Sequence, residues 1–191
     1  MEWKLWKKKC INAHSTYVNS ILQLSNDILV SGSNGEGALK FWNLNDFSLY
    51  KTFNNIYSTA YNNSLIEIDN ILFVGEKGGI RIFQVKNNNN IDSTIYKDSS
   101  IWILSLSFIG NDIIIAGAKN GNIYLYKIIK QGNINLENIN AIQNNLKIVK
   151  NEFNYSISGL TYYSQYNNKS FIISCSVDGK IKMYEHFSNE I

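Results

Sequence analysis

The chain has 191 residues, which is enough for one large domain or two small ones, and 45% of them are hydrophobic. Charged residues make up 17%, and the formal net charge of +3 is too small to indicate a polyanionic partner. This composition excludes wholesale disorder. The two cysteines, Cys10 and Cys175, form neither a disulfide framework nor a metal-binding spacing.

Short runs of β-branched and aromatic residues alternate along the chain with turn clusters rich in Asn and Gly, and there is no proline. This pattern predicts an all-β protein made of hairpins. Four similar hairpins follow one another, with strands at 28–33 and 38–42, 71–75 and 80–83, 113–118 and 123–126, and 171–176 and 180–184. Their turns are predicted at 34–37, 76–79, 119–122 and 177–179.

The hairpins recur at a regular interval: 42 residues separate Gly37 from Gly79, and 42 separate Gly79 from Gly121. The next interval, to Gly179, is 58 residues and contains an Asn-rich insertion loop at 131–146. A further apolar run precedes each hairpin, at 17–24, 64–68, 101–108 and 155–163, and outer strands are predicted at 8–12, 49–53, 93–96 and 147–152. Four strands in about 42 residues are typical of one propeller blade.

We therefore predict a single domain or fragment, 1–191, that forms an all-β propeller segment of about four four-stranded blades. The repeats are predicted at 8–43, 48–84, 92–128 and 147–185. Counting strands leaves the last blade without an outer strand, which favours an incomplete ring, either a fragment of a longer protein or a chain that another subunit completes. Such a ring exposes two apolar blade faces and is expected to self-associate. The alternative is four-bladed closure, with 8–12 pairing to the last blade.

The first copy resembles a WD repeat in Ala13-His14, in the strand 30–33 and in the segment 39–43, which includes Trp42. The resemblance implies a hydrogen-bond network of His14, Ser31 or Ser33, a turn aspartate and Trp42. Gly and Glu stand where the turn aspartate belongs. The fourth copy carries Ser174, Asp178 and Tyr184 at matching positions but no histidine.

No pattern in the sequence indicates catalysis. The two histidines, His14 and His186, are far apart and have no partner at a ligand spacing. The glycine turns join two strands, whereas a phosphate-binding loop leads into a helix. We therefore expect no enzyme activity, no cofactor and no metal.

We expect instead a non-enzymatic scaffold that mediates protein–protein interactions in a multiprotein complex, in the cytoplasm or nucleus and without a membrane segment. The WD resemblance implies the contact positions Tyr17, Asn19, Lys77, Ile101, Trp102, Lys119 and Val177. Trp102 is the predicted anchor, because an exposed Trp is typical of binding sites. Packing of Trp102 inside a blade is the alternative.

Two other functions remain open. The first is a nucleic-acid-associated subunit, in which the basic cluster Lys4, Lys7, Lys8 and Lys9, interleaved with Trp3 and Trp6, binds phosphates and stacks on bases. The second is an enzyme built on a propeller.

Overall fold

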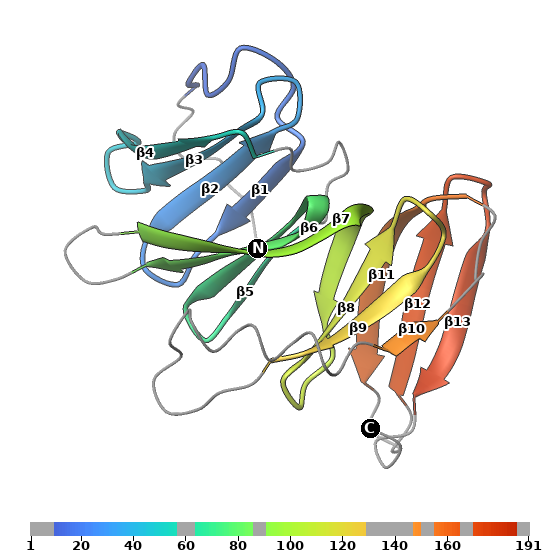
Figure 1. Cartoon of the computed structure of the whole chain (residues 1–191). Helices are drawn as coiled ribbons and strands as arrows, with labels where there is room; N and C mark the ends of the chain where they lie inside the picture. Colours follow the sequence, from blue (N-terminus) through green and yellow to red (C-terminus); the bar gives the residue numbers. More distant parts are fainter. Residues whose placement is uncertain are drawn as a thin grey trace, which may run out of the picture.

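The structure is a computed structural model that describes residues 10–56, 64–85, 91–128, 147–149, 155–164 and 170–186. Side chains are described for all of these except 94–100, 147–149, 164 and 186. The described residues form thirteen strands in three antiparallel sheets, none of them closed, and no helix (Figure 1). They accordingly include no helix able to span a membrane. The predicted lysine cluster at 4–9 and the insertion 131–146 lie outside the described residues.

The first sheet has the order β1-β2-β3-β4. Its strands are β1 (Ser20–Gln23), β2 (Ile28–Ser33), β3 (Ala38–Asn43) and β4 (Leu49–Asn54). The predicted hairpin at 28–42 is confirmed as the β2–β3 pair, and β4 adds the fourth strand. The predicted outer strand at 8–12 is wrong over its described part, because residues 10–12 form no strand.

The second sheet has the order β10-β9-β8-β7-β6-β5. Its strands are β5 (Leu65–Ile68), β6 (Ile71–Val85), β7 (Ile91–Phe108), β8 (Ile113–Ala118), β9 (Ile123–Lys127) and β10 (Lys147–Val149). β7 pairs with β6 through its residues up to Trp102 and with β8 from Ile103 onward. The sheet therefore consists of two parts that meet at one point of β7.

One strand, β6, runs through residues 76–79, where the sequence predicts a turn. The chain nevertheless reverses there. The evidence is the distance of 3.1 Å between Nη2 of Arg81 and Oε1 of Glu76. Five residues of extended chain span about 16 Å, beyond the reach of these two side chains. Gly78 and Gly79 lie between them with φ of 98° and 125°, a conformation that glycine adopts at no steric cost.

The third sheet has the order β11-β12-β13. Its described strands are β11 (Ile157–Ser164), β12 (Ser170–Ser176) and β13 (Ile181–His186). The predicted hairpin at 171–184 is confirmed as the β12–β13 pair, and the hairpin at 113–126 as the β8–β9 pair. The first sheet and the third lie at opposite ends of the molecule, with the second between them (Figure 1).

The core lies between successive groups of strands. One apolar cluster joins the first sheet to β5 and β6, a second joins β6 to β7, β8 and β9, and a third joins β8 and β9 to the third sheet. Phe41 and Phe53 of the first sheet contact Phe83 of β6 with ring centroids 5.7 and 5.0 Å away. Burial of these aromatic and aliphatic side chains holds the groups together.

Candidate functional site

Two lysine ammonium groups lie over the ring of Trp102. Nζ of Lys119 is 3.9 Å from the ring centroid, and Nζ of Lys77 is 5.2 Å from it. Both distances fall within the range of cation–π attraction. The ring is partly exposed, and both lysines are exposed. The structure thus brings together three of the residues that the sequence predicts as contact positions.

The backbone fixes this arrangement from two strand partners. Trp102 sits at the point of β7 where pairing changes from β6 to β8, and its partner across the ladder is Lys77. On the other side, the amide of Lys119, the residue after β8, donates a hydrogen bond to the Trp102 carbonyl at 2.9 Å. Because both lysines are placed by hydrogen-bonded backbone, the site is organised before any partner binds.

The described side chains around Trp102 make the site electropositive. Glu76, the acidic neighbour of Lys77 in the chain, is buried and forms its ion pair with Arg81. Neither Lys77 nor Lys119 forms an ion pair with a carboxylate within the described part of the chain. An indole face with two ammonium groups suits an acidic ligand, since carboxylates pair with the lysines and apolar groups pack on the ring.

The other predicted contact residues do not join this cluster. Tyr17 and Val177 are exposed, but Tyr17 lies in the segment before β1 and Val177 in the turn between β12 and β13. The side chain of Asn19 is turned toward its own sheet, where its Oδ1 accepts a hydrogen bond from the amide of Asn34 at 3.0 Å. Ile101 is 4% exposed and lies in the core, so its side chain is not available to a partner.

A second polar cluster connects His14, in the segment before β1, to side chains of the first sheet. Nε1 of Trp42 donates a hydrogen bond to Oγ of Ser31 at 2.8 Å, and Oγ of Ser31 lies 2.8 Å from Nε2 of His14. Nδ1 of His14 lies 2.6 Å from Oε2 of Glu36. Nζ of Lys40 donates to Oε1 of Glu36 at 3.0 Å. The five side chains form one continuous chain of polar contacts.

Glu36 is the member that the sequence does not identify, because the resemblance implies an aspartate in the turn. The longer glutamate side chain reaches His14 from the turn between β2 and β3. The hydrogen bond from Lys40 lowers the pKa of Glu36 most, partial burial opposes this effect, and the hydrogen bond from His14 lowers the pKa further. The result is a pKa below its ordinary value of 4.5.

The fourth copy does not repeat this cluster. Oγ of Ser174, the residue that corresponds to Ser31, is buried without a hydrogen-bond partner in the described part of the chain. Asp178 instead forms an ion pair with Lys180, with Oδ2 3.1 Å from Nζ. The sequence could not show this, because both copies have the same serine at this position.

The described residues contain no group of three or more His, Cys, Asp or Glu side chains able to hold a metal ion. Comparison of the chain with protein-family models and with curated proteins finds no match.

Proposed function

We propose that the chain is a propeller segment of four blades that acts as a non-enzymatic scaffold and binds a protein partner at the Trp102 site. The blades are β1–β4, then β5 with the two arms of β6 and the start of β7, then the end of β7 with β8–β10, and finally β11–β13. The contacts of Trp102 with Lys77 and Lys119 carry the proposal.

The division of the second sheet supports the blade assignment. Reversal of β6 at Gly78 and Gly79 gives β5, β6 and the first part of β7 four antiparallel arms in total. The second part of β7 with β8, β9 and β10 gives another four. Four-stranded antiparallel groups joined in series are typical of propellers.

The polar cluster of the first sheet also supports the assignment. Its contacts join Trp42, Ser31, His14 and Glu36, which are the residue types that the WD-repeat resemblance implies, with glutamate in place of aspartate. A network of this kind ties the segment before β1 to the β2–β3 hairpin. A rigid rim of this type binds a partner with little loss of conformational entropy.

The chemistry of the Trp102 site indicates an acidic protein segment as the partner. A test measures the binding of fluorescein-labelled peptides rich in Glu and Leu, with the same peptides carrying Lys in place of Glu as controls. We expect only the acidic peptides to bind. Trp102→Ala should weaken binding by roughly 30-fold, the equivalent of about 2 kcal/mol for an aromatic anchor, at an unchanged melting temperature.

Reversal of charge tests the two lysines. Lys77→Glu and Lys119→Glu should each weaken binding of the acidic peptide, whereas Lys127→Glu at the exposed end of β9 makes the same change of charge away from the site and should have little effect. Equal effects of all three variants would show that binding depends on the net charge of the chain and not on the Trp102 site. Preferential binding of a single-stranded oligonucleotide, with a steep loss of affinity as salt rises, would favour the nucleic-acid function instead.

A further inference from the structure

Two of the junctions between successive blades share one contact, an isoleucine that packs over a glycine. A Cβ atom built on Gly75 would lie 2.6 Å from Cγ2 of Ile103, and one built on Gly117 would lie 2.6 Å from Cγ2 of Ile157. Both isoleucines are fully buried. Because these glycines have no side chain, the inner strand of the following blade can approach closely. The same contact therefore joins the second blade to the third and the third to the fourth.

The position of the isoleucine follows from the strand register. Ile103 stands two residues before Ser105, whose ladder partner is Gly117. Ile157 stands two residues before Gly159, whose ladder partner is Cys175. Cys175 therefore occupies in β12 the place that Gly117 has in β8.

In the first blade, the corresponding residue is Val18, which stands two residues before Ser20, the ladder partner of Gly32. Val18 is 49% exposed. Ile21, which follows Ser20, corresponds to Leu106 and Leu160 and is 64% exposed, whereas both leucines are buried. We call Val18 and Ile21 the head face. It has the pattern of an inner strand that seats on a preceding blade.

The last blade also has exposed apolar side chains, on the side of its sheet that faces away from the third blade. Ile172 of β12 and Tyr184 of β13 pack against β8 and β9, so the residues that alternate with them point to the other side of the sheet. We call this side the tail face, formed by Tyr163, Phe171, Ile173, Cys175, Ile181 and Met183. Ile181 is 72% exposed and Met183 62%. Their counterparts in the third blade, Ile123 and Leu125, pack in the cluster that joins β8 and β9 to the last blade, with Ile123 buried and Leu125 partly buried.

The two free faces also match in size. At the two internal contacts described above, isoleucine meets glycine. At the free faces the larger Cys175 replaces the glycine, and the smaller Val18 replaces the isoleucine. A smaller side chain over a larger one conserves the volume that a packed interface must fill.

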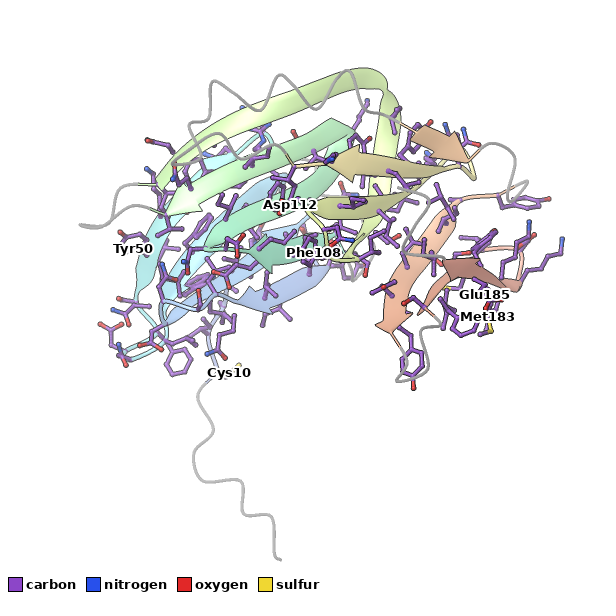
Figure 2. All side chains as sticks on the ribbon, turned by 90° about the horizontal axis from the view of Figure 1, so that it is seen from below. Cys10, Tyr50, Phe108, Asp112, Met183 and Glu185 are labelled. Atoms are coloured by element: carbon purple, nitrogen blue, oxygen red, sulfur yellow. The ribbon has the colours of Figure 1, made fainter. Side chains whose placement is uncertain are left out.

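We propose that the head face of one copy of this chain packs on the tail face of a second copy, through the same contact that joins its own blades. The proposal rests on the four-blade assignment made above. Figure 2 shows Met183 of β13 and Tyr50 of β4 at opposite ends of the molecule, in agreement with the separation of the first and third sheets in Figure 1. Two copies joined twice in this way close a ring of eight blades with two-fold symmetry.

A disulfide tests the contact directly. The Cβ of the isoleucine lies 3.2 Å from the position of a Cβ on Gly75 and 3.0 Å from one on Gly117. Disulfides need a Cβ separation of roughly 3.5–4.5 Å, so a small adjustment places a cysteine at position 18 within reach of Cys175. In a Cys10→Ser background, Val18→Cys should give disulfide-linked dimers or larger species on mild oxidation, and these should disappear on reduction.

The control adds Cys175→Ser, which should abolish the cross-link. Cross-linking that persists in this control would indicate a head-to-head contact and overturn the proposal. A disulfide within a single chain, seen as an oxidised monomer without free thiols, would indicate four-bladed closure and overturn it as well. Absence of any cross-link would also overturn the proposal.

Complementation tests the direction of the contact. By sedimentation at micromolar concentration, the parent should be a dimer or larger, and Ile21→Glu and Met183→Glu should each be monomers with parental melting temperatures. An equal mixture of the two variants should form a heterodimer, because one variant keeps its tail face and the other its head face. Leu49→Glu, at a leucine that is 52% exposed on the edge strand β4, is the control and should associate like the parent.

If Ile21→Glu does not fold, Val18→Glu outside the strand takes its place. A monomeric parent overturns the proposal, and so do variants that associate like the parent. Binding of the acidic peptide at Trp102, measured on the same variants, separates this result from a failure of the proposed scaffold function, since a monomer that still binds the peptide refutes only the contact between copies.

Discussion

Nδ1 of His14 lies 2.6 Å from Oε2 of Glu36, and this contact sets the direction of the hydrogen bonds in the polar cluster of the first sheet. A carboxylate only accepts, so Nδ1 donates; when Nε2 carries no proton, it accepts from the hydroxyl of Ser31. That hydroxyl oxygen accepts in turn from Nε1 of Trp42. Each polar atom in the series has a partner of the opposite kind. Every member is therefore needed by its neighbours.

The first prediction concerns the middle of this series. Ser31→Ala removes the acceptor of Trp42 and the donor to His14, and a buried polar group left without a partner costs about 1–3 kcal/mol. We expect a loss of stability of this size in urea denaturation. Ser174→Ala is the matched control, because this buried serine has no hydrogen-bond partner in the described part of the chain and its loss should be neutral or stabilising. Equal effects of the two substitutions would show that the network adds no stability.

The second prediction follows from the lowered pKa of Glu36. The unfolded chain binds this proton more readily than the folded protein, so the stabilisation is complete above the ordinary value of 4.5 and is lost as the pH falls through the lower folded pKa. The difference in unfolding free energy between the parent and Glu36→Gln should be largest at about pH 6 and should shrink below about pH 4.

A second variant isolates the cause of that shift. Lys40→Met removes the hydrogen bond that lowers the pKa of Glu36 most, so a titration of the Glu36 carboxyl by NMR should move upward toward 4.5. A titration that does not move would show that Lys40 is not the cause. A parent and a Glu36→Gln variant that differ equally at low and neutral pH would contradict the role of the charge.

The sequence predicts hairpins better than it predicts contacts between groups of strands. The hairpins β2–β3, β8–β9 and β12–β13 follow from alternating apolar strands around glycine turns, which depend on neighbouring residues only. The seating of Ile103 on Gly75 and of Ile157 on Gly117 depends on residues 28 and 40 positions apart, so no local pattern reveals it. The role of Glu36 in the polar cluster was not predicted for a different reason. The resemblance implies an aspartate in the turn, and the longer glutamate side chain contacts His14 in its place.

At the candidate site, the individual residues were also easier to predict than their arrangement in space. Trp102, Lys77 and Lys119 were each predictable from their places in the repeats, whereas their convergence depends on the change of pairing partner within β7. The burial of Ile101 follows from strand alternation, because its neighbour Trp102 points to the opposite side.

The third prediction concerns the turn between β12 and β13. Gly179 has a φ of 79°, and its amide donates to the carbonyl of Ser176 at 3.1 Å. Nothing lies within 4 Å of a Cβ built there, so a substitution tests the backbone alone. Gly179→Val should lower the unfolding free energy by about 1–3 kcal/mol, since a β-branched residue is strained at positive φ. Gly179→Asn should cost much less, because Asn tolerates this conformation. If both variants melt like the parent, the turn is assigned incorrectly.

The last prediction tests the reversal of β6. The side chains of Glu76 and Arg81 are 5% and 15% exposed, so removal of one partner leaves the other charge nearly buried. Glu76→Gln should therefore lower the unfolding free energy by about 3–5 kcal/mol, whereas the double variant Glu76→Leu with Arg81→Met, which replaces the pair by apolar side chains, should be much closer to the parent. The control is the pair of Asp178 with Lys180, whose lysine is largely exposed, so Lys180→Met should cost less than about 1 kcal/mol. If β6 instead ran straight through residues 76–81, the two side chains could not meet, and the single and double changes would simply add in a double-mutant cycle.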